Sequence, residues 1–283
     1  MNKKVLFFMV FCLISLLSLF IYQDREINDG KLHIVFCDVG QGDGIYIRTS
    51  DGSDIVIDGG PDNSILLCLT NNMPFWDRTI ELMILTHPDA DHYTGLIPIA
   101  RQYNVLSFAT SFTQKDVPGY QTLFEILTAQ QTQQRFVCQG DKFSFPDELK
   151  IEIVWPRSCS LGSTEKNDNS VVAVFDYKDL EVLLTGDAEE NIGDFYQDRV
   201  GDIDILKVPH HGSKDGVDKD YLSAIEPEVA VLSVGGKNRY GHPTRPILDL
   251  LSDSKVTILR TDKDGDVMIK SDGDTYTISS SKN

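Results

Sequence analysis

Basic residues are scarce in this chain. Its 283 residues include 26 lysines and arginines against 43 aspartates and glutamates, which gives a formal net charge of −17. Proteins hold nucleic acids mainly through contacts from Lys and Arg to phosphates. The sequence also contains no basic stripe with interleaved aromatic residues. The composition therefore argues against tight binding of nucleic acid through the general surface.

Histidine and cysteine are also few. None of the six histidines lies between His92 and His210. The five cysteines do not have the spacing of a metal-binding motif, and Cys12 falls in an N-terminal apolar run. The other four cysteines allow three disulfide pairings, among which the sequence does not choose. Cys37 follows a predicted core strand, so we expect a buried thiol there.

No internal repeat or long low-complexity linker divides the chain, which indicates a single folded domain. Lys3 and Lys4 precede an apolar run over residues 5–22, which is long enough to span a bilayer. We expect a signal anchor over residues 1–22, a short linker over 23–30 and one domain over 31–283. The N-terminal lysines favour a single-pass protein whose domain lies outside the cytoplasmic membrane. The alternative is a cleaved signal peptide and a secreted protein.

The densest chemical signal is the six-residue segment that contains His87, Asp89, Asp91 and His92. An apolar run over residues 82–85 precedes it and predicts a buried strand. Imidazoles and carboxylates crowded into one turn would be costly to desolvate unless cations held them together. Both groups are ligands that suit zinc, manganese or iron. The segment predicts a metal site, and the alternative is a polar loop with two incidental histidines.

Three further apolar runs end in residues of the same kind. Asp58 follows residues 55–57, Asp187 follows residues 182–185, and the pair His210 and His211 follows residues 205–209. Glycine stands beside each of them and allows the backbone and a ligand to approach closely. We expect these strands to deliver their polar ends to one sheet edge, where a metal site is rigidly supported.

The order of these motifs resembles the metallo-β-lactamase superfamily. The segments over residues 37–44 and 240–243 are similar to its ComEC/Rec2-like branch, in which the domain occurs within DNA-uptake channel proteins or as a secreted or anchored form. The resemblance runs from about Lys31 to the C-terminus. It implies an α/β (α+β) fold, a four-layer αββα sandwich, that holds two divalent metal ions, Zn²⁺ or Mn²⁺.

The resemblance also implies roles for individual residues. The expected metal ligands are His87, Asp89, Asp91, His92, Asp187 and His210. Of these, Asp187 would bridge both ions, and His210 is favoured over His211 because it directly follows its strand. Asp58 would orient a ligand histidine from behind. The family's usual intermediate histidine is missing, and Asn169 lies near its place.

A ligand set rich in carboxylates should accept Mn²⁺ at least as well as Zn²⁺. We expect two-metal hydrolysis of a phosphoester, with Asp91 and Asp187 as catalytic metal-site residues. His242 would steer a phosphate or protonate the leaving oxygen, or else it is a simple turn residue. The candidates for contact with substrate are Asp38, Gln41, Asp43, His211 and Ser213. Basic residues near the motifs, such as Lys207, would attract a phosphate or be ordinary surface charge.

The predicted function is phosphodiester cleavage by a membrane-anchored metallohydrolase. The resemblance points to DNA as the substrate and to DNA-uptake machinery as a partner. With one candidate membrane segment, this chain does not form a DNA channel alone. The alternatives are a hydrolase of another phosphoester, such as an envelope polymer or a nucleotide, and a catalytically weak metal-binding scaffold subunit.

Overall fold

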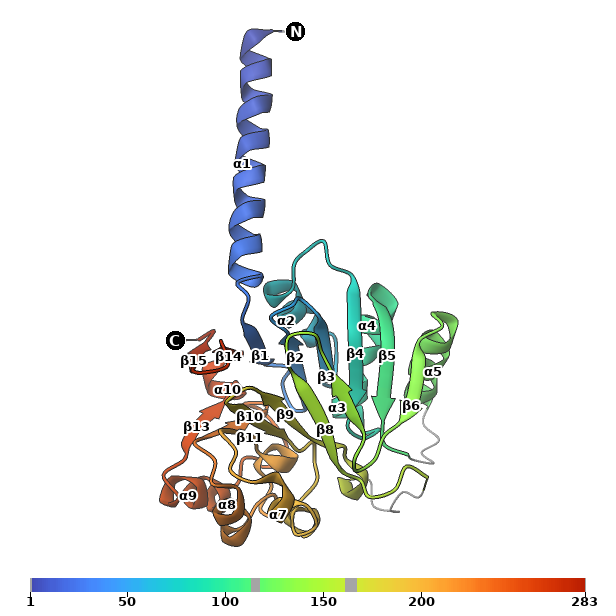
Figure 1. Cartoon of the computed structure of the whole chain (residues 1–283), viewed down its shortest axis with the longest axis vertical. Coiled ribbons are helices and arrows are strands. Elements are labelled where there is room, and N and C mark those ends of the chain that lie inside the picture. The colour runs from blue at the N-terminus through green and yellow to red at the C-terminus, as the bar shows by residue number, and fades with distance from the viewer. Residues whose placement is uncertain (1, 113–117, 161–166, 283) are drawn as a thin grey trace.

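The chain forms one long helix followed by a body in which helices cover two β-sheets (Figure 1). The computed structural model describes residues 2–112, 118–160 and 167–282. The helices are α1 (Lys3–Ile27), α2 (Ser64–Asn72), α3 (Ala90–Tyr93), α4 (Leu96–Gln102), α5 (Pro118–Ala129), α6 (Glu190–Gly193), α7 (Gln197–Val200), α8 (Lys219–Ile225), α9 (Arg245–Asp253) and α10 (Thr261–Asp264). The 3₁₀ turns are η1 (Asn167–Asn169) and η2 (Pro209–Gly212).

The first sheet has eight strands in the order β15-β14-β1-β2-β3-β4-β5-β6. Their bounds are β1 (Leu32–Phe36), β2 (Gly44–Arg48), β3 (Asp54–Gly59), β4 (Thr79–Leu85), β5 (Asn104–Thr110), β6 (Gln133–Phe136), β14 (Val267–Ser271) and β15 (Tyr276–Ser280). The second sheet has seven strands in the order β13-β12-β11-β10-β9-β8-β7. Their bounds are β7 (Lys142–Ser144), β8 (Lys150–Trp155), β9 (Val172–Tyr177), β10 (Leu180–Leu184), β11 (Ile205–Lys207), β12 (Val229–Leu232) and β13 (Thr257–Arg260).

Alternation along the strands builds three apolar layers. Side chains such as Ile34 and Phe175 belong to a buried core shared by the two sheets. Their neighbours along the strands point the other way, because successive side chains of a strand face opposite sides. Val35 thus packs with residues of α2, α4 and α5, and Leu206 packs with residues of α8 and α9. The predicted four-layer αββα architecture is confirmed.

Parallel pairing brings the metal-type residues to one edge. Strands β3 and β4 pair in parallel, as do β10 and β11. Asp58 lies near the end of β3, and His87 closely follows β4. Asp187 and the pair His210 and His211 follow β10 and β11 in the second sheet. Because parallel strands end at the same edge, both sheets contribute side chains to one site.

Two disulfides join the four cysteines of the body. Cys37 pairs with Cys68 and links the end of β1 to α2. Cys138 pairs with Cys159, and the Cys159 sulfur lies 3.7 Å from a carboxylate oxygen of Asp141. The expectation of a buried free thiol at Cys37 is wrong. The sequence places Cys68 on a separate helix, and only the packing of α2 against the first sheet brings the two sulfurs together.

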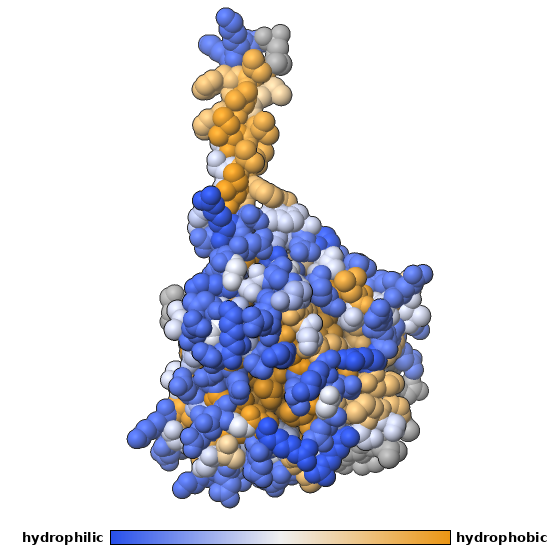
Figure 2. All heavy atoms as spheres, in the orientation of Figure 1, coloured by the Kyte–Doolittle hydropathy of each residue, from blue (hydrophilic) through white to orange (hydrophobic). Residues whose placement is uncertain are grey.

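Most of helix α1 projects away from the body, and none of its residues is buried (Figure 1). Figure 2 shows apolar side chains along most of its length. By length and composition alone, this helix is able to cross a membrane. It continues to Ile27, so the first residues of the expected linker are helical.

Candidate metal centre

The turn between β4 and α4 presents four of the expected ligands. His87 is fully buried at the end of β4, and His92 is fully buried in the short helix α3. Asp89 and Asp91 remain partly exposed on the same turn. Gly42 packs against the backbone of this turn with a φ of 138°, and a Cβ there would lie 2.1 Å from the Asp91 carbonyl oxygen. Only glycine fits that approach.

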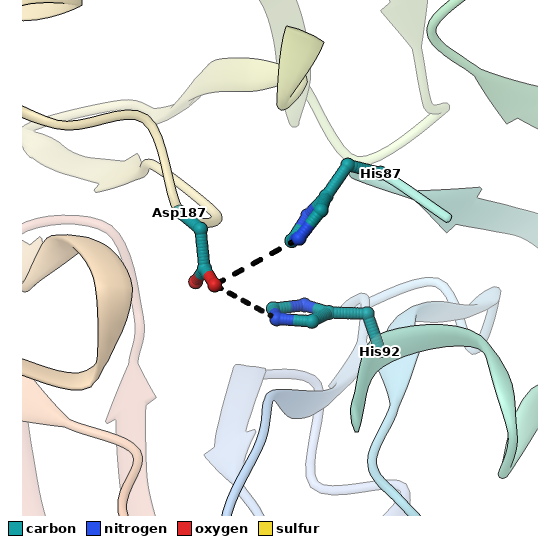
Figure 3. Close-up of side chains that lie close together, drawn as sticks. All are labelled: His87, His92 and Asp187. Atoms are coloured by element: carbon teal, nitrogen blue, oxygen red, sulfur yellow. Dashed lines mark ion pairs between the residues drawn. The ribbon is translucent and has the colours of Figure 1, made fainter. Parts of the chain in front are cut away.

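Asp187 lies at the centre of the cluster. It enters from β10, on the side opposite His87 and His92, and the three side chains point toward one another (Figure 3). Its Oδ2 atom is 3.8 Å from His87 Nε2 and 3.3 Å from His92 Nε2. The same oxygen is 3.6 Å from His211 Nε2. One carboxylate oxygen therefore faces three imidazole nitrogens, a set of donor groups that divalent cations would suit.

Two groups of ligand atoms flank this carboxylate. On one side, His87 Nε2 lies 3.8 Å from an oxygen of Asp89. On the other side, His211 Nε2 lies 3.6 Å from an oxygen of Asp91, and these two residues form a tight group with His92. Each group offers imidazole and carboxylate, the donor set of zinc and manganese sites.

Hydrogen bonds at Nδ1 fix how two of the imidazoles face the centre. His92 Nδ1 lies 2.7 Å from Asp58, which also accepts bonds from the N–H and hydroxyl of Thr86. His211 Nδ1 lies 2.9 Å from the carbonyl oxygen of Ser233. With Nδ1 donating to these acceptors, the Nε2 atoms of both rings are directed at the cluster. His87 Nδ1 contacts two hydroxyl groups instead, at 3.1 and 3.3 Å.

The cluster contains buried atoms that lack a hydrogen bond. Within the described ranges, these are the Nε2 atoms of His87, His92 and His211 and one oxygen each of Asp43 and Asp187. Buried polar atoms without partners are costly, and several of them facing one another are accounted for by a bound cation. The residues therefore fit the divalent ions that the sequence predicts.

The two consecutive histidines of η2 have different surroundings. His211 is 2% exposed and lies in the cluster. His210 points toward the rim, where its Nδ1 atom is 2.6 Å from Glu189 and its Nε2 atom is 3.9 Å from Asp187. Both residues adopt left-handed backbone conformations, with φ of 46° and 55°. The geometry thus favours His211 over the expected His210 as the last histidine ligand.

The charges of the cluster depend on one another. Burial opposes the positive charge of His211, but Asp187 and Asp43 outweigh it and raise the pKa of His211 to about 9. Burial and the neighbouring His92 lower the pKa of His87 to about 4. Burial also opposes the charge of Asp187, yet the histidines hold its pKa well below its usual range. The proton on His211 thus balances negative charge that cations would otherwise neutralise.

Lys207 is a buried cation behind the cluster. It is fully buried at the end of β11, forms an ion pair with Asp43 and donates a hydrogen bond to the carbonyl oxygen of Gly186 at 2.8 Å. Asp43 in turn lies 3.4 Å from His211. Lys207 is therefore neither a surface charge nor a residue that attracts phosphate. Asp43 supports the cluster from its buried side and does not face substrate. The position of Lys207 within an apolar strand, directly after Leu206, is the sequence signal for its burial.

A cavity of about 160 Å³ opens beside the cluster. It is lined by Gln41, Asp89, Asp91, Asn167, Asp187, His210, His211, Tyr240 and His242. Gln41 accepts a hydrogen bond from the Gly235 N–H at 3.2 Å, which holds it at the rim. The rings of His210 and His242 have centroids 5.4 Å apart. The rim is thus rich in imidazole, while the floor is the candidate metal centre.

Three candidates lie away from this cavity. Asp38 forms an ion pair with Lys282 at 2.7 Å. Ser213 is buried and donates a hydrogen bond to Glu189 at 3.1 Å. Asn169 is buried in η1, and Asn167 of the same turn lines the cavity instead. Sequence reasoning missed Glu189, although it stands two residues after Asp187.

The two-sheet sandwich and the His/Asp cluster at its strand ends define a protein of the αββα class with a candidate metal centre. The family profile described as the metallo-beta-lactamase superfamily matches residues 37–236. The chain therefore belongs to the metallo-β-lactamase superfamily, whose members typically bind divalent metal ions.

Curated relatives identify a branch. The chain is 25% identical to ComE operon protein 3 of Bacillus subtilis over 278 residues, covering 92% of this chain and 35% of that protein. It is 26% identical to Recombination protein 2 of Haemophilus influenzae over 260 residues, covering 90% of this chain and 31% of that protein. The predicted similarity to ComEC/Rec2-like proteins is confirmed. The chain spans about a third of the length of these relatives.

Solved structures share the fold at low sequence identity. YhfI from Bacillus subtilis, a metallo-beta-lactamase fold protein, superposes with a TM-score of 0.59 at 10% identity, over 85% of this chain and 100% of that one. A long form RNase Z from yeast superposes with a TM-score of 0.53 at 12% identity, over 82% of this chain and 41% of that one. These likenesses establish the fold alone.

Proposed function

We propose that this protein is a two-metal phosphodiesterase that cleaves DNA outside the cytoplasmic membrane. The observation that carries the proposal is the set of buried Nε2 atoms of His87, His92 and His211 around one oxygen of Asp187. A scaffold protein has no need of such a paired ligand set. Competence and recombination proteins among the relatives support DNA as the substrate.

Different side chains have different roles in the proposed hydrolysis. His87, Asp89 and Asp187 would hold one divalent ion, Zn²⁺ or Mn²⁺, and Asp91, His92, Asp187 and His211 would hold the other. When bound, the two ions supply an activated water and stabilise negative charge on the phosphate. Asp58 contacts the His92 ring, and Lys207 forms an ion pair with the Asp43 side chain. Both contacts help to hold the metal ligands in position. Gln41 and His242 face the cavity, where a phosphodiester would lie.

The acidic composition bears on how DNA would be held. A net charge of −17 repels a polyanion from the general surface, so attraction must come from the metal centre and nearby groups. We expect weak, metal-dependent binding that relies on a partner protein to deliver the strand. DNA-uptake machinery is the proposed partner.

The apolar helix α1 supports membrane attachment of the domain. We propose that α1 crosses the cytoplasmic membrane once, with Lys3 and Lys4 inside and the metal centre outside. The two disulfides agree with this placement, because disulfides persist in oxidising compartments.

The proposed activity is tested on the full chain in detergent, stripped of metal with a chelator. The protein is reloaded separately with Mn²⁺ and with Zn²⁺ and assayed on single-stranded DNA, double-stranded DNA and bis(p-nitrophenyl) phosphate. We expect metal-dependent DNA cleavage, with Mn²⁺ at least as effective as Zn²⁺. Cleavage of the small ester alone would point to another phosphoester, and stoichiometric metal binding without cleavage would favour the scaffold alternative.

His242 offers a test of the rim. Its ring lies in the cavity wall next to His210, outside both ligand groups. The His242→Ala variant should lower turnover about 10²- to 10³-fold, the range for loss of a proton donor or a charge-stabilising group, with metal content unchanged. Turnover on the small ester and metal content by mass spectrometry are measured together. Loss of metal in this variant would show that His242 is a ligand.

A further inference from the structure

Three aromatic rings meet where α1 joins the body. The Phe20 ring of α1 lies 4.3 Å from the Trp76 ring and 6.3 Å from the Phe75 ring, measured between centroids. Phe75 and Trp76 themselves lie 4.8 Å apart, edge to face. They belong to the loop between α2 and β4, far from Phe20 in sequence.

All three residues of this aromatic cluster, Phe20, Phe75 and Trp76, are partly exposed. Phe75 is 57% exposed, Phe20 is 40% exposed and Trp76 is 38% exposed. Contiguous exposed aromatic side chains mark surfaces that meet another apolar phase or partner. The metal centre does not account for them, because they lie at the amino end of β4 whereas His87 follows its carboxyl end.

The position of the aromatic cluster along α1 indicates which partner it contacts. The apolar run of α1 ends at Tyr22, and charged residues begin at Asp24. Phe20 lies within the last apolar turn, so its contact with Trp76 holds the loop level with the end of the apolar run. Tryptophan is enriched at this level of membrane proteins, where one part of its ring is apolar and its N–H reaches polar groups. Figure 2 shows the apolar column of α1 reaching the surface of the body.

We infer that Phe75 and Trp76 insert into the headgroup region of the bilayer that α1 crosses. The inference rests on the proposed membrane attachment and extends it from a tether to a docked domain. A second contact beside the helix prevents the body from swinging freely about α1. Because α1 is proposed to cross the bilayer, the bilayer surface lies directly beside the aromatic cluster. It is therefore the proposed partner of Phe75 and Trp76.

Docking through this loop sets the direction in which the metal centre opens. Strand β4 starts at Thr79, just after the loop, and runs seven residues to Leu85, just before His87. At about 3.3 Å per residue, this places the centre roughly 20 Å from the bilayer surface. The arrowhead of β4 points away from α1 (Figure 1). The cavity thus faces away from the lipid, toward substrate arriving from outside.

The chain's two tryptophans provide the test. Trp76 lies in the loop, whereas Trp155 ends β8 and donates a hydrogen bond to the carbonyl oxygen of Asp168, near the cavity. The full-length Trp155→Phe variant reports on Trp76, and the matched Trp76→Phe variant reports on Trp155. Both are reconstituted into phosphatidylcholine vesicles that carry a nitroxide on the headgroup or at a shallow acyl position.

Flotation with the vesicles is measured first, and quenching of fluorescence second. We expect both variants to float, with lipid nitroxides quenching Trp76 at least several-fold more than Trp155. Flotation with equal, weak lipid quenching of both tryptophans would overturn docking and leave the anchor intact. Failure to float would overturn the membrane anchor itself, and with it the docked domain.

Discussion

The Asp187→Asn variant is expected to lose nearly all hydrolytic activity while it keeps its fold. The Asp187 carboxylate lies within 3.8 Å of the Nε2 atoms of His87, His92 and His211. The amide is nearly the same size but carries no charge, so it would bridge two cations poorly. A loss of about 4 kcal/mol of charge stabilisation corresponds to a roughly 10³-fold decrease in kcat.

Turnover of bis(p-nitrophenyl) phosphate with saturating Mn²⁺ measures this loss. Circular dichroism and thermal unfolding of the metal-free protein supply the control for folding. The Asp38→Asn variant is a matched substitution, since Asp38 pairs with Lys282 away from the cavity, and its activity should remain within about twofold of the parent protein. Unchanged turnover in Asp187→Asn would rule out the two-metal proposal.

The second large expected effect distinguishes His211 from its neighbour His210 as a metal ligand. His211→Ala is expected to lose one of the two metal ions and at least about 100-fold of activity, since even groups that only orient metal ligands are worth up to that much. His210→Ala should keep both ions, because the His210 side chain is 28% exposed and contacts Glu189 at the rim. Metal content after dialysis against a fixed free Mn²⁺ concentration measures the difference.

The paired design guards against a general loss of structure. Both variants truncate the same side chain within the same 3₁₀ turn, so damage to the fold should affect them similarly. Loss of metal in His210→Ala with retention in His211→Ala would reverse the assignment. Full metal content in both variants would mean that neither histidine is needed at this site.

The motifs of the sequence, through their resemblance to the metallo-β-lactamase superfamily, were enough to predict the architecture. Apolar runs of strand length that each end in Asp or His predict the sheet edge, because strand period and burial are local properties of the chain. The contact of Asp58 with a ligand histidine was implied by the same resemblance, and the structure places Asp58 at His92. The apolar run of α1 needs only its length and composition to be identified.

Tertiary structure alone decided which neighbouring residue does what. His210 and His211 are adjacent in sequence, and left-handed backbone conformations at both turn one to the cluster and the other to the rim. Lys207 lies in an apolar strand that predicts its burial, but only the packing of β11 beside the segment before β2 gives it Asp43 as a counter-charge. The pairing of Cys37 with Cys68, and of Phe20 with Trp76, depends on contacts between segments that the sequence keeps apart. Local patterns fix which elements form, whereas the packing of those elements fixes which side chains meet.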